Sequence, residues 1–190
     1  MCGRYTLFTS EECEEIREII EEVNRKHHNA EIKTGEIFPT NLAPILIADS
    51  GKLEPYPIKW GFPGFKGNNV IINARSETAE EKNMFRKSLY TKRCIVPSTG
   101  FYEWDKEKRK FRFNLPESNI LYMAGLYNEF KGEPRFLILT TAANPSVSPI
   151  HHRMPVILRK EECSAWVENT EKALELIHSA MPALSREAAQ

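Results

Sequence analysis

The chain begins Met1-Cys2-Gly3-Arg4-Tyr5, and the interpretation of the rest of the sequence depends on this stretch. Cys2 has a small side chain, so we expect Met1 to be removed and Cys2 to become the N-terminal residue. Its α-amine and thiol would then form a 1,2-aminothiol, a group that no internal residue offers. The reference pKa values are about 7.7–8.0 for the amine and about 8.5 for the thiol, so modest shifts make both nucleophilic near neutral pH.

An aldehyde would react with this group in two steps. The amine forms an imine, and the thiol then closes a five-membered thiazolidine ring. The alternative is an incidental cysteine in a poorly ordered terminus. Gly3, Arg4 and the strand-like segment 5–8 favour a terminus that is tied into the fold.

Composition indicates one globular domain spanning residues 1–190. The chain is 41% hydrophobic and 27% charged, which is typical of soluble proteins. It has no apolar run of membrane-spanning length and no signal-peptide pattern, so we expect a cytoplasmic, intracellular protein. The four cysteines are dispersed without a C-x-x-C pair, which gives no zinc-ribbon pattern and predicts reduced thiols.

The net charge of zero argues against a nucleic-acid partner, but the charges are unevenly distributed. Residues 10–36 hold nine acidic and four basic side chains, so the rest of the chain is net basic. An acidic helix could therefore be turned away from a basic face. Two ordinary solvated surfaces are the alternative interpretation.

Periodicity predicts several helices. Thr9 and Glu12 fit a capping box at the start of an amphipathic helix that runs to about Lys26. Ser76 is the expected cap of a second helix over about 77–90. Two short helices are expected at about 160–167 and 170–180.

Alternating and apolar runs predict an extensive set of strands. Segment 35–41 is expected to be a loop, and Pro44, Pro55 and Pro57 indicate sheet edges or bulges. The expected strands are 5–8, 42–48, 53–60, 70–72, 93–97, 110–115, 121–127, 135–141 and 156–158, with a further extended run at 98–104.

Three stretches carry candidate functional residues. The aromatic loop 60–65 could stack on bases or cap the core. Asn73 and Arg75 fall at the end of the strand 70–72, where polar groups are commonly presented to a site. Glu103 lies between aromatic residues; in a pocket its pKa would rise and suit proton transfer, whereas on a solvated face it would have no such role.

The run Ile150-His151-His152-Arg153 is compatible with a metal, phosphate or acid–base site. Neighbouring residues on a strand point in opposite directions, so a metal site would need further convergent ligands.

Seven segments together resemble the SOS response-associated peptidase family, which is also known for shielding abasic sites in DNA. The match spans residues 2 to about 158. The segments are Met1-Cys2-Gly3-Arg4-Tyr5, Trp60-Gly61-Phe62-Pro63, Asn73-Ala74-Arg75-Ser76-Glu77-Thr78, Arg93-Cys94-Ile95-Val96-Pro97, Gly100-Phe101-Tyr102-Glu103-Trp104, Ala124-Gly125-Leu126 and Ile150-His151-His152-Arg153-Met154-Pro155.

The resemblance implies an α+β fold with a mostly antiparallel, β-barrel-like core and peripheral helices. It also implies a DNA-repair function: binding of single-stranded DNA that contains an abasic site, followed by a covalent thiazolidine between Cys2 and the ring-opened deoxyribose. We expect a monomer that needs no metal or organic cofactor and is associated with the nucleoid when bound to DNA. The peptidase activity in the family's name is interpreted as self-removal of the residues before Cys2.

The resemblance also assigns residues. The four catalytic residues are Cys2 as the nucleophile, Asn73 as a positioning residue, and Glu103 and His151 as acid–base groups. The four DNA-binding residues are Arg4, Arg75 and Arg153 at phosphates and Trp60 near the bases.

The chain departs from the family pattern at Phe38-Pro39-Thr40-Asn41 and at His152, which stands where an acidic residue is common. Two other functions remain open from the residues alone. Class II glutamine amidotransferases also begin Met-Cys-Gly, and a plain single-strand-binding module would use the aromatic and basic residues without a covalent step.

Overall fold

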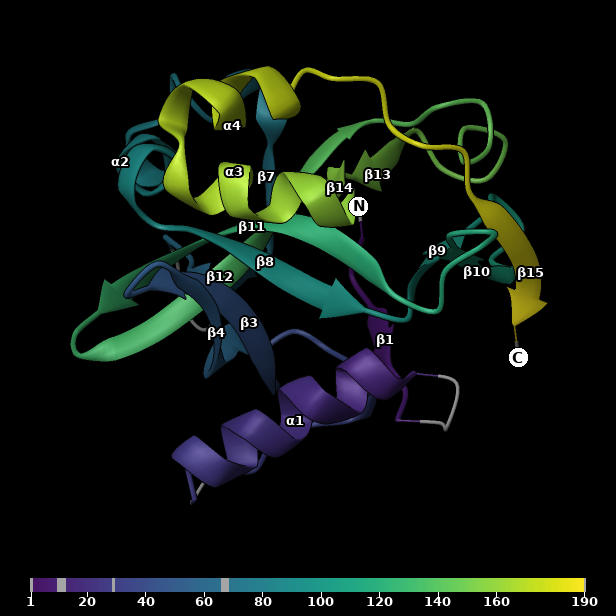
Figure 1. Ribbon diagram of the computed structural model, residues 1–190. Helices are drawn as coiled ribbons and strands as arrows, with labels where there is room; N and C mark the ends of the chain where they lie inside the picture. The colour runs from purple at the N-terminus through teal and green to yellow at the C-terminus, as the bar shows by residue number, and fades with distance from the viewer. Residues whose placement is uncertain (1, 10–12, 29, 66–68, 190) are drawn as a thin grey trace.

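The computed structural model describes residues 2–9, 13–28, 30–65 and 69–189. Strands form the centre of the molecule and helices lie at its periphery (Figure 1). The α+β fold class with a mostly antiparallel β core is therefore confirmed. None of the helices in the described ranges combines the length and apolar character needed to span a bilayer.

The strands build a five-stranded sheet, an eight-stranded sheet and a short two-stranded ribbon. The five-stranded sheet has the order β15 (Ser185–Ala189), β10 (Lys110–Asn114), β9 (Gly100–Trp104), β1 (Tyr5–Leu7) and β2 (Gly35–Ile37). The eight-stranded sheet has the order β13 (Arg153–Pro155), β12 (Glu133–Ala142), β4 (Lys52–Trp60), β3 (Leu42–Asp49), β8 (Arg93–Ser98), β11 (Leu121–Phe130) and β14 (Ile157–Leu158), with β7 (Asn73–Arg75) paired to β12. The ribbon pairs β5 (Phe62–Pro63) with β6 (Val70–Ile71).

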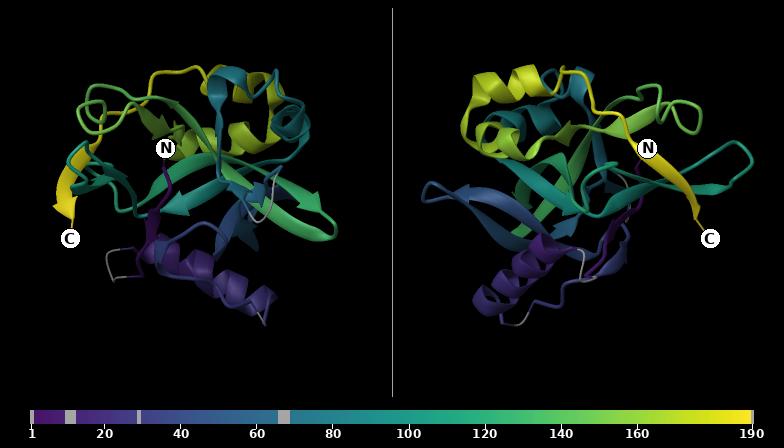
Figure 2. Two further views of the ribbon diagram at one scale, coloured as in Figure 1. Left: turned by 180° about the vertical axis from the view of Figure 1, so that it is seen from behind. Right: turned by 45° about the vertical axis from the view of Figure 1, so that its right-hand side comes forward.

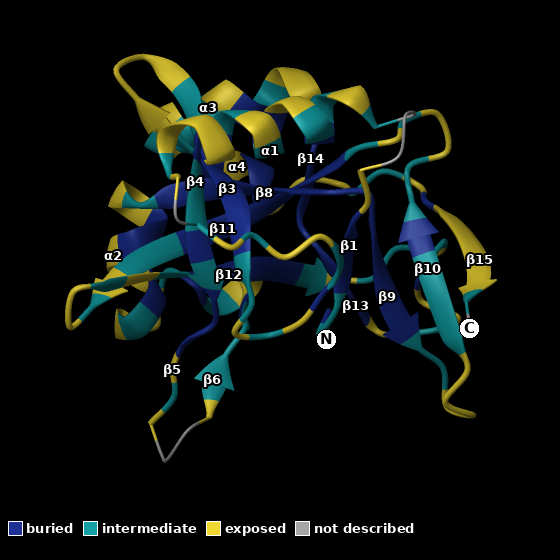
Figure 3. Cartoon of the chain, turned by 90° about the horizontal axis from the view of Figure 1, so that it is seen from below, coloured by how far each residue is buried: buried dark blue, intermediate teal, exposed yellow. Residues whose placement is uncertain are grey.

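The helices cover the outer surfaces and bury one stripe each. Ile16, Ile19 and Val23 form the buried stripe of α1, and Trp166 anchors α3. Figure 3 shows this arrangement as buried central strands beneath helices with exposed outer surfaces. The helices are α1 (Glu14–Lys26), α2 (Asn83–Thr91), α3 (Cys163–Glu168) and α4 (Thr170–Leu176), with 3₁₀ turns η1 (Ser76–Thr78) and η2 (Lys160–Glu162).

The N-terminal strand β1 lies inside the five-stranded sheet. Tyr5 pairs with Ile37 of β2 on one side and with Phe101 of β9 on the other. The start of the described chain consequently lies in the middle of the molecule, whereas the C-terminal strand lies at its edge (Figure 2). The expectation of a tied-down N-terminus is confirmed, because β1 has ladder partners on both sides.

Several local predictions need correction. The expected helix over 77–90 is divided into η1, a turn and α2, which begins only at Asn83. Buried Ala79 lies in this turn and packs into the core, so the break serves tertiary packing at the cost of helix continuity. The segment 35–41 contains β2 instead of being entirely a loop. The last helix, expected over about 170–180, ends at Leu176, and the strand β15 that follows it was not predicted. The predicted capping residue Glu12 lies outside the described residues.

The prolines of β3 and β4 are tolerated inside the eight-stranded sheet. These strands pair with each other along their length, and Pro44 lies opposite Pro57. Their other neighbours touch them only briefly: β8 at Leu46 and β12 at Lys59 and Trp60. Neither β8 nor β12 pairs with one of the prolines, so no hydrogen bond to these two strands requires the N–H group that proline lacks.

Candidate active site

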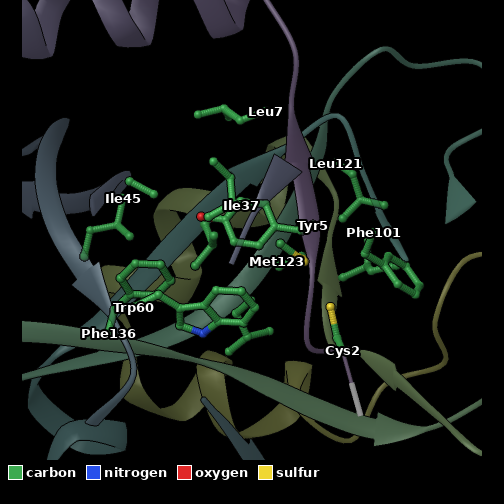
Figure 4. Close-up of a cluster of buried hydrophobic side chains, with 14 of the residues drawn as sticks. Cys2, Tyr5, Leu7, Ile37, Ile45, Trp60, Phe101, Leu121, Met123 and Phe136 are labelled. Carbon is green, nitrogen blue, oxygen red and sulfur yellow. The ribbon is translucent and has the colours of Figure 1, made fainter. Parts of the chain in front are cut away.

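Cys2 lies just before β1 and is fully buried among large apolar side chains (Figure 4). Its Sγ is 3.8 Å from the carbonyl oxygen of Arg4. Burial, and next the carboxylate of Glu103, raise the pKa of the Cys2 thiol well above its ordinary value. The sulfur is therefore held as a neutral thiol until a partner removes its proton.

Asn73 of β7 fixes the backbone of Cys2. Its Nδ2 donates a hydrogen bond to the Cys2 carbonyl oxygen at 2.9 Å. Parallel pairing of β7 with β12, with Asn73 opposite Ile138, sets this position. Its Oδ1 is buried and has no hydrogen-bond partner among the described residues. An unsatisfied buried acceptor is costly, so this oxygen is available to a donor that enters the site.

Glu103 projects from β9 toward the core side of the sheet. Alternation along β9 places Phe101 on the same side, where it stacks with Phe113, as the sequence predicts. Glu103 is only 3% exposed, and this burial raises its pKa to about 7. A carboxyl with this pKa is divided between its two protonation states at neutral pH, which suits it to accept and return a proton.

His151 lies beside Glu103, with its Nδ1 3.8 Å from Glu103 Oε1. The backbone N–H of Arg153 donates to the same Nδ1 at 3.1 Å. The carbonyl oxygen of Arg153 lies 3.2 Å from the same Nδ1. The N–H contact needs the ring proton on Nε2 and the carbonyl contact needs it on Nδ1, so the two contacts fit either tautomer. Burial lowers the pKa of His151, so the ring is mainly neutral at pH 7.

The four predicted catalytic side chains therefore gather in one place from four separate segments. Asn73 donates a hydrogen bond to the Cys2 carbonyl oxygen, the Glu103 carboxylate raises the pKa of the Cys2 thiol, and His151 lies beside Glu103. No group of three or more His, Cys, Asp or Glu side chains suited to a metal ion occurs within the described ranges. The groups that meet here are a thiol, an amide, a carboxyl and an imidazole, which is a set suited to proton transfer around a nucleophile.

The four predicted DNA-binding residues have different surroundings. Arg75 is exposed on β7, and Arg4 is partly exposed with its guanidinium 4.2 Å from the centre of the Phe38 ring. Arg153 is buried, forms ion pairs with Glu77 at 2.5 and 2.8 Å, and also donates to the Thr140 carbonyl oxygen.

Trp60 is a core residue in this structure. Its side chain is fully buried, its indole Nε1 donates to the Ile72 carbonyl oxygen at 3.0 Å, and its ring meets Tyr5 edge-on. The base-stacking interpretation of loop 60–65 therefore does not fit Trp60 in this conformation. The core-capping interpretation fits both Trp60 and Phe62, which is also fully buried.

A groove of about 1100 Å³ begins at Asn73 and runs between β7, α2 and the end of β11. Its lining contains three cationic side chains, Arg75, Lys82 and Lys87, and no acidic residue among the described residues. The apolar part of the lining is Phe65, Ile71, Ala74, Met84, Phe85 and Phe130.

Phe65, beside this groove, is 85% exposed. The sequence identified this loop as aromatic without showing which of its rings is exposed: Trp60 and Phe62 are buried, and Phe65 is exposed.

Comparison with known proteins gives a consistent result. The family model described as SOS response associated peptidase (SRAP) matches residues 1–189. A Bacillus subtilis protein named abasic site processing protein YoqW is 38% identical, over 88% of this chain and 80% of its own length. The Escherichia coli abasic site processing protein YedK is 28% identical, over 88% and 79%, and rat HMCES, which has the same descriptive name, is 29% identical, over 74% and 56%.

Solved structures share the fold. A crystal structure of a Bordetella bronchiseptica protein superposes with a TM-score of 0.78 at 21% identity, with both chains fully covered. A Bacteroides thetaiotaomicron protein superposes with a TM-score of 0.76 at 23% identity, over 100% of this chain and 92% of the other. With the match to the family model over nearly every residue, these findings show that the chain belongs to the SOS response-associated peptidase family.

Proposed function

We propose that this protein processes abasic sites in DNA by forming a covalent thiazolidine between Cys2 and the deoxyribose aldehyde. The observation that carries the proposal is the meeting of Asn73, Glu103 and His151 around the buried Cys2. The names of the relatives, which describe abasic-site processing, support the same reaction.

The reaction balances with the groups present. After Met1 is removed, the Cys2 amine gives its extra proton to Glu103 and adds to the aldehyde carbon. Loss of one water molecule leaves an imine. The thiol sulfur then bonds to the imine carbon, and its proton passes by way of Glu103 to the nitrogen. The product is the thiazolidine, and one molecule of water is released in total.

His151 and Asn73 assist different steps. An abasic deoxyribose exists mainly as a closed hemiacetal. As the ring opens, the imidazolium form of His151 can protonate the ring oxygen, and the neutral imidazole then takes the proton of the hemiacetal hydroxyl, which leaves the aldehyde. Asn73 holds the Cys2 carbonyl and offers its Oδ1 to the amine or to a sugar hydroxyl. Steps of proton transfer of this kind typically contribute about 10²–10⁴ in rate.

The groove beside Asn73 suits a single DNA strand. Phosphates would meet Arg75, Lys82 and Lys87, and bases would meet the apolar lining with Phe65 as a stacking ring. We expect the protein to act inside the cell, on the nucleoid, and as a monomer.

The intact mass of the protein after incubation with abasic single-stranded DNA tests the proposal. We expect an increase equal to the mass of the DNA minus one water molecule, and the adduct should survive denaturation. Cys2→Ala should give no adduct, and neither should a protein with an uncleaved extension before Cys2. Cys2→Ser is the closer match in shape. Both variants keep the α-amine, so borohydride should trap an imine from each, but without the thiol no stable thiazolidine should form.

Two results would overturn the proposal. A full yield of denaturation-resistant adduct from Cys2→Ala would remove Cys2 as the nucleophile. Strand binding without any adduct from the wild-type protein would identify a single-strand-binding module, and glutaminase activity would support an amidotransferase.

We further propose that the site removes Met1 by its own hydrolysis of the Met1–Cys2 bond, with Glu103 accepting a proton from the attacking water. Glu103→Gln leaves Cys2 unchanged, so trimming by a host aminopeptidase would not depend on this substitution. Self-removal would depend on it, and on that proposal intact mass should show that Glu103→Gln retains Met1. Complete trimming of the variant would assign the step to the host enzyme.

A further inference from the structure

One carboxylate on the outer face of the five-stranded sheet pairs with two cations. Glu36 of β2 accepts from Arg4 Nη1 at 3.1 Å and from Lys110 Nζ at 2.5 Å. Lys110 lies on β10, which is separated from β2 by two strands, so the contact reaches across the face. We call Arg4, Glu36 and Lys110 the Glu36 cluster.

Aromatic rings hold both cations of the Glu36 cluster. Arg4 Cζ lies 4.2 Å from the centre of the Phe38 ring and 5.1 Å from that of Trp104. Lys110 Nζ lies 4.0 Å from the centre of the Tyr102 ring. Cations above aromatic faces are attracted to them, so both cations would keep their places if the carboxylate moved away.

The cluster carries two positive charges and one negative charge. Although burial opposes ionisation, Lys110 and Arg4 hold the pKa of Glu36 below its ordinary value, so the carboxylate is charged at neutral pH. The side chains of Arg4 and Glu36 are 28% and 30% exposed. The side chain of Lys110 is 13% exposed, so solvent reaches the cluster mainly at Arg4 and Glu36, and the three side chains together carry one net positive charge that attracts an anion.

The backbone connects this cluster to the candidate active site. The Arg4 carbonyl oxygen accepts from the Tyr102 backbone N–H at 2.9 Å and lies 3.8 Å from Cys2 Sγ. Arg4 is also only two residues from Cys2. A strand whose sugar reacts at Cys2 would bring a neighbouring phosphate close to these cations.

We propose that Arg4 and Lys110 form one subsite for a backbone phosphate and that Glu36 fills this subsite as a resident anion in the free protein. The inference rests on the function proposed above and adds Lys110 and Glu36 to its binding residues. A phosphate must displace the carboxylate, so undamaged strands bind weakly and are released. A strand with an abasic site is retained because the covalent bond does not depend on this affinity.

The test measures the affinity of an undamaged single-stranded oligonucleotide, which cannot form an adduct. Glu36→Gln removes the competing charge and keeps the size of the side chain. We expect it to tighten binding about three- to tenfold at low salt, with a gain that shrinks as salt rises, because binding then releases an additional counterion. Glu22→Gln is the control, since Glu22 also bridges an arginine and a lysine, at 2.6 and 2.9 Å, but lies on α1. It should change the affinity less than twofold.

Lys110→Gln tests the second cation. It should weaken binding in the wild-type background and should cancel most of the gain in the Glu36→Gln background, so the two changes are not additive. Weaker or unchanged binding by Glu36→Gln, or an equal gain from Glu22→Gln, would overturn the inference.

Adduct formation by the wild-type protein separates this inference from the proposed function. If the wild type forms the adduct and Glu36→Gln leaves affinity unchanged, only the Glu36 inference fails. If the wild type neither binds the strand nor forms an adduct, both fail.

Discussion

Glu103 and His151 are neighbours whose pKa values are moved in directions that keep both groups neutral. Burial raises the pKa of Glu103 to about 7 and lowers that of His151. The Glu103 carboxyl can therefore change its protonation near neutral pH, whereas the His151 ring is mainly neutral there. Geometry then separates their roles: the Glu103 carboxylate raises the pKa of the Cys2 thiol, whereas the Nδ1 of His151 contacts the backbone of Arg153.

The separate roles of Glu103 and His151 predict that variants at the two positions respond differently to a substrate whose sugar ring is already open. With Met1 removed beforehand by an added methionine aminopeptidase, Glu103→Gln keeps the size of the side chain but cannot accept a proton, so imine formation and ring reversal should both slow, by about 10²–10⁴. His151→Ala should slow the opening of the closed sugar by a similar factor. A substrate with an already open aldehyde should rescue His151→Ala and leave Glu103→Gln slow. Rate constants for both variants on both substrates check this, and equal rescue would remove the division of roles.

The raised pKa of Glu103 also predicts how stability depends on pH. Between about pH 4.5 and 7 the unfolded chain has lost the proton that the folded protein keeps, so stability falls as pH rises through this window. A shift from 4.5 to about 7 corresponds to about 3 kcal/mol. Glu103→Gln should remove this part of the pH dependence and should be more stable than wild type at pH 8. Urea unfolding of both proteins at pH 5 and pH 8 measures how the free energy of unfolding changes with pH. The same change in Glu103→Gln as in the wild type would contradict the attribution to Glu103.

At the scale of secondary structure, Arg93 joins two helix ends. It is 5% exposed and donates to main-chain carbonyls at the ends of α2 and α3. The acceptors are the carbonyl oxygens of Leu89, Tyr90, Trp166 and Val167, at 2.5 to 3.1 Å. The last carbonyls of a helix have no partner within it and carry partial negative charge, so one guanidinium satisfies both ends.

Arg93→Met should therefore be strongly destabilising, although it preserves much of the apolar stem. Several buried carbonyl groups would lose their donors, and we expect a loss of about 3 kcal/mol or more in the free energy of unfolding. Arg93→Lys should lose less, because it keeps the charge and one donor group. Arg109→Met, at an arginine that is 69% exposed, is the control and should change stability by less than about 0.5 kcal/mol. Equal effects at the two positions would refute the role given to Arg93.

The success of sequence reasoning differed between elements for physical reasons. Strands such as β3, β4 and β8 follow from alternation and local propensity, which the residues themselves carry. The break between η1 and α2 depends on Ala79 packing into a core built from distant segments, and β15 depends on β10 as a partner. Neither dependence is visible in the local pattern.

The same distinction applies to the candidate site. The family resemblance assigned Cys2, Asn73, Glu103 and His151 from separate segments, and the structure brings these four side chains together. The motifs did not distinguish buried Trp60 from exposed Phe65, because the direction of a ring in a Gly- and Pro-rich loop depends on the sheet beneath it.

At the scale of the whole molecule, zero net charge conceals a separation of charge. The central part of the acidic segment forms α1, which packs against β3 and β4, while the groove beside Asn73 has only cationic charged residues in its described lining. Local charge, and not the net value, determines whether a strand is attracted. A neutral protein can therefore bind DNA on one surface in a salt-dependent way.

The groove predicts two separable effects on binding to an undamaged strand. Arg75→Gln should weaken binding and reduce the slope of log affinity against log salt by about 0.7, because one phosphate contact is lost. Phe65→Ala should weaken binding by about 1–3 kcal/mol, the usual contribution of one stacked base, and leave the slope unchanged. Phe8→Ala is the aromatic control, since Phe8 is 37% exposed but lies at the end of β1, outside the groove lining.

Arg153→Gln completes this comparison. Arg153 was expected to contact phosphate, but its guanidinium is paired with Glu77 inside the fold. Its substitution should lower the free energy of unfolding and leave the salt slope unchanged, in contrast to Arg75→Gln. Strand titrations at several salt concentrations, with urea unfolding of each variant, distinguish the two arginines. An affinity of the wild-type protein that does not depend on salt would exclude the groove as a phosphate-binding surface. A smaller slope of log affinity against log salt for Arg153→Gln would show that Arg153 does contact a phosphate.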